Sequence, residues 1–229
     1  MASSSQVTID NQPMPHVIVH GLERSVYTRI VRLALEEKGV DYTLREVEIF
    51  GPNGVPSDHL TRHPFGRIPV LEHQGFQLYE TFAITRYIDE HFPGSPLQPT
   101  AARDRARLNQ IVGVLDAYAY RPMVWGVFVE RVLALPSGAD EATVATSLVE
   151  SRRCLEALCT IADCSPWLVG EQITLADLHA FPILRYLALA SEGREILQGF
   201  PELRRWLERM SLRASVQRTM SEYERVDEK

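Results

Sequence analysis

A proline interrupts the short apolar run Ile68-Pro69-Val70-Leu71. Proline cannot donate a backbone hydrogen bond to a central strand, so Pro69 must begin a strand, lie at an edge or mark a bend. A cis peptide bond costs only about 0.5–1 kcal/mol before proline, against about 3 kcal/mol before other residues. If the Ile68-Pro69 bond is cis, the N–H and C=O of Ile68 turn outward, where they can pair with the backbone of a small bound peptide.

The residues after Pro69 predict a hairpin that leads into a helix. Residues 70–73 and 76–79 flank Gln74-Gly75, which suits a two-residue hairpin turn. Glu80-Thr81 then precedes a helical pattern over residues 81–92. Because the first N–H groups of a helix are unpaired, Thr81 can cap this helix and also help to seat an anion such as a carboxylate. A simple N-terminal cap is the alternative interpretation.

The order of elements predicts an α/β domain followed by an all-α domain. Apolar patterning favours, in order, a strand, a helix, a strand, a helical turn, the hairpin and a helix, at 16–20, 25–38, 42–49, 56–62, 70–79 and 81–92. Five amphipathic helices are expected after them, at 103–120, 122–135, 140–163, 175–189 and 201–214. The predicted organisation is a disordered tail over 1–13, an α/β domain over 14–93, a Pro- and Gly-rich linker over 94–102 and a helical domain over 103–229.

Composition argues against several classes of partner. The net charge is −6 without a long basic run, so neither nucleic acid nor an anionic membrane is an expected partner. No stretch approaches the roughly 20 apolar residues of a membrane span, and the first residues lack the pattern of a signal peptide, which predicts a cytoplasmic protein. The seven histidines show no metal-ligand spacing, so no metal is expected. The three cysteines are interpreted as reduced and structural.

Three segments resemble the soluble glutathione S-transferases, in particular bacterial or phi-like members that use a serine, and the likeness extends from about residue 15 to 215. They are the run from Gly21 to Gly39, the run from His63 to Leu71 with Glu80-Thr81, and Ile173-Thr-Leu-Ala-Asp-Leu178. The resemblance implies a thioredoxin-like N-terminal domain, an all-helical C-terminal domain and a homodimer. Thr174 and Asp177 form a capping box, which we expect to stabilise the fold without taking part in chemistry.

Ser25 is the residue that we expect to activate the thiol of glutathione. It lies at the start of a predicted helix, where unpaired N–H groups and the helix dipole favour an anion, and Arg29 follows at the phi-type spacing. Lowering a thiol pKa from about 8.5 to about 6.5 takes roughly 2.7 kcal/mol. Ser25 as a helix cap alone, and Tyr27 as the active hydroxyl, are the alternatives. Because no cysteine precedes Cys154, disulfide exchange through the N-terminal domain is excluded.

The resemblance also implies where glutathione, as a substrate, is bound. The backbone of Ile68, beside Pro69, would pair with the cysteinyl part, Thr81 would hold the γ-glutamyl carboxylate, and Glu80 would face the ammonium group. Arg67 could bind the glycyl carboxylate. Asn53, in the preceding loop, is a further candidate for binding glutathione. For this residue, a solvated turn position without a ligand is the preferred interpretation.

Aromatic residues around Arg121-Pro122 predict a pocket for a hydrophobic electrophile, and Tyr118, Arg121 and Trp125 are its candidate residues. Packing in the helical core is the alternative. The expected reaction is attack of the glutathione thiolate on the electrophile. Glutathione-dependent reduction of organic hydroperoxides would use the same thiolate, and a non-catalytic binding protein of the same fold is a third hypothesis.

Overall fold

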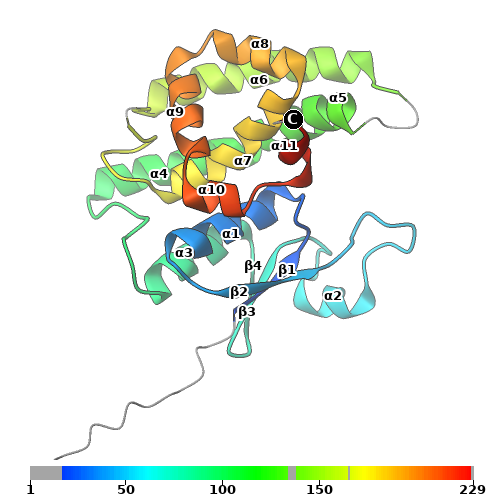
Figure 1. Cartoon of the computed structure of the whole chain (residues 1–229), viewed down its shortest axis with the longest axis vertical. Coiled ribbons are helices and arrows are strands. Elements are labelled where there is room, and N and C mark those ends of the chain that lie inside the picture. The colour runs from blue at the N-terminus through cyan, green and yellow to red at the C-terminus, as the bar shows by residue number, and fades with distance from the viewer. Residues whose placement is uncertain (1–16, 134–137, 165, 228–229) are drawn as a thin grey trace, which may run out of the picture.

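The computed structural model describes residues 17–133, 138–164 and 166–227. The expected tail over residues 1–13 and the first residue of the expected first strand, His16, lie outside the described residues. The described part forms a thioredoxin-like sheet domain and a helical domain, which are stacked along the long axis of the molecule (Figure 1). This confirms the predicted fold class.

The sheet domain is built around β1 (Val17–Gly21), whose five residues are all buried. β1 pairs in parallel with β2 (Tyr42–Glu46) and antiparallel with β3 (Val70–His73), and β4 (Phe76–Tyr79) forms the edge beside β3. The hairpin strands have the predicted bounds. The Ile68-Pro69 bond is cis and directly precedes β3.

Three helices complete this domain: α1 (Val26–Glu37), α2 (Ser57–Arg62) and α3 (Thr81–His91). Ser25 caps the N-terminus of α1, and Gly39, with a φ of 65° that favours glycine, follows its C-terminus. α1 and α3 lie between the sheet and the helical domain (Figure 1). Both ends of α1 therefore lie close to the junction of the two domains.

The linker after α3 is held by buried polar contacts. Asp89 on α3 accepts hydrogen bonds from Lys38 Nζ at 3.1 Å and from the backbone N–H of Leu97 at 2.7 Å. The carbonyl of Leu97 in turn accepts from the N–H of Leu175 at 2.9 Å. Leu97 is buried and joins a hydrophobic core that continues from the sheet into the helices.

The helical domain surrounds α7. All residues of α7 except Arg185 are buried. The helical segments, in chain order, are α4 (Ala102–Val114), η1 (Leu115–Ala119), η2 (Arg121–Val129), α5 (Glu130–Val132), α6 (Glu141–Ile161), α7 (Leu175–Leu189), α8 (Ser191–Gln198), α9 (Pro201–Ser211), α10 (Ala214–Arg218) and α11 (Glu222–Asp227).

The capping box of α7 is present as predicted, and it does more than cap the helix. Asp177 accepts from the N–H of Thr174 at 2.8 Å and from its hydroxyl at 2.9 Å. The same carboxylate accepts from the N–H of Leu168 at 2.9 Å and from Nε1 of Trp206 at 2.8 Å. Asp177 thus joins α7 to the preceding loop and to α9.

Some predicted boundaries were wrong. The second strand was expected to reach Ile49 but ends at Glu46. A helix break was expected at Arg121-Pro122, but α4, η1 and η2 follow one another, with Pro122 in the first turn of η2. Pro122 therefore removes one backbone donor inside a continuous helical run, at a place where the helix is π-helical and not regularly α-helical.

Three short helices, α8, α10 and α11, were not predicted. α8 holds few apolar residues, and its Gly193 lies so close to α7 that an added Cβ would come within 1.9 Å of the Leu187 carbonyl oxygen. Tertiary packing therefore decides that α8 forms. Apolar periodicity in the sequence does not reveal such packing.

Candidate active site

A pocket of about 270 Å³ lies at the junction of the two domains. It is lined by Tyr27, His63, Arg67, Ile68, Pro69, Glu80, Thr81, Phe82 and Asp116. Five of these residues, at positions 67–69, 80 and 81, are among the predicted glutathione-binding residues. The structure therefore brings most of the predicted binding set together.

One wall of the pocket is formed by Arg67, Ile68 and Pro69, directly before β3. Ile68 and Pro69 are buried, whereas the Arg67 side chain is exposed and provides a cation at the rim. The backbone here is held by His59, whose Nε2 lies 2.7 Å from the carbonyl oxygen of Arg67. Ile68 lies outside the β1–β3 register, which begins at Val70.

The start of α3 forms another part of the pocket lining, with Glu80, Thr81 and Phe82. Thr81 was expected to cap this helix, but Glu80 occupies the N-cap position and its side chain makes no capping hydrogen bond. Glu80 has a φ of 71°, which is unfavourable for a residue other than glycine and is common at binding sites. The first N–H groups of α3 therefore have no side-chain acceptor from the cap, and they suit a bound carboxylate.

The helical domain contributes Asp116, on η1, a residue that no sequence pattern singled out. The Tyr27 hydroxyl donates to Asp116 Oδ1 at 3.1 Å. Burial and then the nearby charge of Glu80 raise the pKa of Asp116, and the hydrogen bond from Tyr27 opposes them. Burial, followed by the charge of Asp116, raises the pKa of Tyr27 well above its ordinary value. Tyr27 is thus a neutral donor whose proton is directed to Asp116.

Ser25 is half-buried at the N-cap of α1, two residues before Tyr27. Its oxygen accepts from the N–H of Thr28 at 3.3 Å, which is the capping interaction that the sequence allowed. Ser25 does not itself line the pocket, but Tyr27 does. Its hydroxyl proton is not used by the bond to Thr28, so Ser25 can cap the helix and donate to a ligand at the same time.

The residues predicted for the electrophile lie on a second, larger feature. Tyr118, Arg121 and Trp125 line a groove of about 850 Å³ between the η1–η2 region and α6. Trp125 also reaches toward the first pocket, because its Nε1 donates to the Tyr120 hydroxyl at 3.1 Å and its ring lies 5.8 Å from that of Phe50. Tyr120 packs on Tyr27, with ring centroids 4.5 Å apart.

Asn53 and the cysteines lie away from the first pocket. Asn53 is exposed in a turn closed by the bond from the N–H of Gly54 to the carbonyl of Gly51, at 3.0 Å, and it does not line the pocket. All three cysteines are free. Burial raises the pKa of Cys154 to about 11 and that of Cys164 to about 12, so neither thiol is activated.

The described residues provide neither a metal site nor a membrane span. No group of three or more His, Cys, Asp or Glu side chains in these residues is arranged to hold a metal ion. Across residues 17–133, 138–164 and 166–227, no helix has both the length and the apolar character needed to cross a membrane.

The fold and the pocket define a two-domain protein in which a thioredoxin-like domain and a helical domain meet at a pocket lined by charged side chains. Comparison with known proteins gives the family. Residues 19–96 match the glutathione S-transferase N-terminal domain, and residues 100–214 match the glutathione S-transferase C-terminal domain. This chain belongs to the glutathione S-transferase family.

Individual relatives agree with this assignment. The chain is 31% identical over 207 residues to glutathione S-transferase 4 of Zea mays. The aligned residues cover 87% of this chain and 89% of that protein. The structure of glutathione transferase F7 from Populus trichocarpa superposes with a TM-score of 0.76 at 25% identity, covering 89% of this chain and 97% of that one. A glutathione S-transferase from Methylobacillus flagellatus, solved with glutathione bound, has a TM-score of 0.71 at 26% identity, covering 89% and 98%.

Proposed function

We propose that this enzyme conjugates the glutathione thiolate to hydrophobic electrophiles, with glutathione bound in the pocket at the domain junction. The observation that supports this proposal most strongly is the charge pattern of that pocket. Arg67 provides a cation at the rim, the start of α3 offers free N–H groups, and Glu80 and Asp116 provide two carboxylates. Glutathione carries two carboxylates, one ammonium group and a peptide backbone, so each of its charges finds a complementary group.

The backbone of Ile68 is available to the cysteinyl part of glutathione, beside Pro69. In this arrangement the start of α3 holds the γ-glutamyl carboxylate, and Glu80 and Asp116 face the ammonium group. Arg67 takes the glycyl carboxylate. Asn53 is exposed and does not line the pocket, so this binding mode does not require it.

Ser25 stabilises the thiolate by donating its hydroxyl proton, and the N-terminus of α1 adds a favourable dipole. The thiol proton leaves to solvent. The sulfur then forms a bond to the electrophilic carbon, and the leaving group departs with its bonding electrons. Holding the two reactants together and stabilising the thiolate supply the rate enhancement, without a covalent enzyme intermediate.

For the electrophile, the aromatic residues Tyr120, Trp125 and Phe50 form the apolar side next to Tyr27. Trp125 belongs both to this aromatic cluster and to the larger groove. Tyr118 and Arg121 line the groove but are not part of the aromatic cluster. We therefore expect Trp125→Ala to raise the KM for an aromatic electrophile more than Tyr118→Ala does.

Parallel assays test the proposed reaction against its alternatives. Purified protein would be incubated with glutathione and either an aromatic halide or an organic hydroperoxide, and the absorbance of bound thiolate would be titrated against pH. Conjugation together with a thiol pKa below about 8.5 is the expected result. Turnover of the hydroperoxide alone would replace conjugation with peroxide reduction. Tight binding without turnover or a pKa shift would indicate a binding protein.

The expected homodimer is a further part of the proposal. The 850 Å³ groove between the η1–η2 region and α6 is open at the surface, and Tyr118, 67% exposed, stands at it. A second copy of the chain would cover this apolar surface. Sedimentation equilibrium should return twice the chain mass of 26.0 kDa, and a single chain mass at micromolar concentration would contradict the dimer. The cytoplasmic location expected from the sequence can be checked by cell fractionation.

A further inference from the structure

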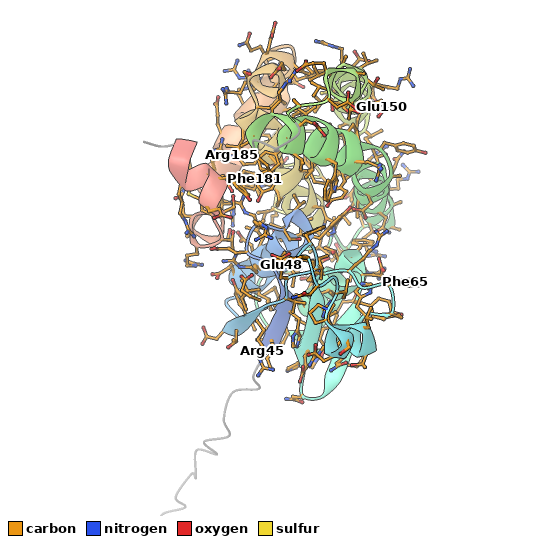
Figure 2. All side chains as sticks on the ribbon, turned by 90° about the vertical axis from the view of Figure 1, so that its right-hand side faces the viewer. Arg45, Glu48, Phe65, Glu150, Phe181 and Arg185 are labelled. Atoms are coloured by element: carbon orange, nitrogen blue, oxygen red, sulfur yellow. The ribbon has the colours of Figure 1, made fainter. Side chains whose placement is uncertain are left out.

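A buried carboxylate near the end of the described chain joins the two domains. Glu224, on α11, accepts a hydrogen bond from Nη1 of Arg29 on α1 and another, at 3.3 Å, from Nε of Arg185 on α7. Glu224 is 1% exposed. The N–H and hydroxyl of Ser221 donate to the same carboxylate at 3.2 and 2.8 Å. Figure 2 shows Arg185 and Phe181 on the side of the molecule that carries this terminal helix.

The carboxylate of Glu224 is the counter-charge of the buried Arg29 guanidinium. The Arg29 side chain is fully buried, and its guanidinium lies 5.2 Å from the ring centroid of Phe181. Among the described residues, Nε and Nη2 of Arg29 have no hydrogen-bond partner. A buried cation that loses its counter-charge is strongly unfavourable, so Glu224 fixes where Arg29 can lie.

Arg29 is directly connected to the candidate active site. Its backbone N–H donates to the carbonyl of Ser25 at 2.9 Å, in the first turn of α1. The residues before Ser25 are held from the same region of the chain. Arg225 pairs with Glu23 at 2.9 Å. The ring of Tyr223 lies edge-on to Tyr186, whose hydroxyl donates to the carbonyl of Arg24 at 2.7 Å.

The C-terminal segment thus holds the loop on both sides of Ser25. The match to the family's C-terminal domain ends at residue 214, so α11 lies outside the matched part of the chain. We propose that Glu224 is a positioning residue, which acts through Arg29 to orient Ser25 toward the bound thiol. This inference rests on the proposed function, because it requires Ser25 to contact glutathione.

The test compares two substitutions that remove one carboxylate charge each. Glu224→Gln alters the contact to Arg29. Glu36→Gln alters a different ion pair between α1 and the C-terminal segment, since Glu36 pairs with Arg218 on α10 at 2.5 Å, at the far end of α1. The readouts are the pKa of the bound glutathione thiol, from thiolate absorbance, and kcat/KM against pH. Melting curves and circular dichroism establish that each variant is folded.

We expect Glu224→Gln to raise the bound thiol pKa by about half a unit to one unit and to lower kcat/KM three- to tenfold near pH 6.5, because a misplaced Ser25 donates a weaker hydrogen bond. Glu36→Gln should leave both quantities unchanged. A folded Glu224→Gln with a wild-type thiol pKa and wild-type kcat/KM would assign Glu224 to stability alone and overturn the inference. If the wild type itself does not lower the thiol pKa, the proposed function fails first.

The half-exposed pair of Glu23 and Arg225 provides a second test that does not alter the buried pair of Arg29 and Glu224. Glu23→Arg and Arg225→Glu should each lower kcat/KM, and the double variant, in which the charges are exchanged, should recover it. Equal loss in the double variant, or no loss in either single variant, would contradict the positioning role of this segment.

Discussion

The hydroxyl of Tyr27 donates to Oδ1 of Asp116 at 3.1 Å, so the phenolic proton points to a carboxylate of the helical domain. Ser25, two residues earlier, uses its oxygen as an acceptor and keeps its proton to donate. The structure thereby separates two hydroxyl groups that the sequence left as alternatives. It favours Ser25 for contact with the thiolate, because the proton of Tyr27 is already engaged.

The first prediction compares these two hydroxyls. Ser25→Ala should raise the pKa of the bound glutathione thiol by about one unit, which corresponds to about 1.4 kcal/mol. Ser25→Thr keeps a hydroxyl and should recover most of that shift, and Tyr27→Phe should change the thiol pKa by about 0.3 units at most. Titration of thiolate absorbance checks all three variants. A larger shift in Tyr27→Phe than in Ser25→Ala would assign the role to Tyr27.

The second prediction concerns Asp116. With Asn in its place, one of two carboxylates near the proposed ammonium position is lost, so the KM for glutathione should rise about three- to tenfold, or about 1 kcal/mol. An analogue of glutathione that lacks the amino group serves as the matched probe. Asp116→Asn should have little effect on its KM. An equal rise for both ligands would show that Asp116 does not recognise the ammonium group.

The third prediction concerns stability. Asp177→Ala would leave buried donors on Leu168, Thr174 and Trp206 without an acceptor, and we expect a loss of about 3–5 kcal/mol in the free energy of unfolding. Asp140→Ala removes the exposed cap of α6 and should cost only about 1 kcal/mol. Urea unfolding measures both. Similar losses in the two variants would mean that the buried network adds nothing beyond a cap.

The fourth prediction is a pH dependence of stability. His179 is fully buried, and burial lowers its pKa to about 4 from an ordinary 6.5, against the opposing effect of its hydrogen bond to the Leu175 carbonyl. Between these values the unfolded chain binds a proton that the native state excludes. The stabilising contribution of neutral His179 is therefore complete above pH 6.5 and is lost as the pH falls toward 4.

Replacing His179 by Leu should remove this part of the acid sensitivity. Between pH 7.5 and pH 5, the variant should lose about 2 kcal/mol less unfolding free energy than the wild type. Ile183→Val, a buried substitution on the same helix, should cost about 1 kcal/mol at both pH values and leave the pH dependence unchanged. Denaturant midpoints at the two pH values provide the comparison, and parallel pH profiles of wild type and His179→Leu would contradict it.

Local chemistry made the sheet domain predictable. The turn at Gln74-Gly75 sets the bounds of β3 and β4, and the cap at Ser25 sets the start of α1. The predicted set around Ile68 and Glu80 lies in one pocket because these residues flank adjacent elements of the hairpin and α3. Such features depend on residues that are close in sequence, so a single chain reveals them.

The helical wall of the site was less predictable, because its helix does not have regular α-helical spacing. η1 and η2 are π-helical, and the Trp125 side chain donates a hydrogen bond to the hydroxyl of Tyr120, five residues earlier. A π-helix changes which residues share a face, so periodicity of 3.6 cannot show that Tyr120 and Asp116 face Tyr27 while Tyr118 and Arg121 line the groove.

By itself, the sequence determined the two-domain architecture, the hairpin that follows Pro69, the N-cap at Ser25 and the capping box of Thr174 and Asp177, because these follow from turns, caps and apolar periodicity. Only the tertiary structure decided that Asp116 meets Tyr27 across 89 residues and that Glu224 meets Arg29 across 195. Charged and polar partners so far apart leave no periodic signal in the chain. They find each other only when packing of the two domains excludes water and a buried charge requires a counter-charge.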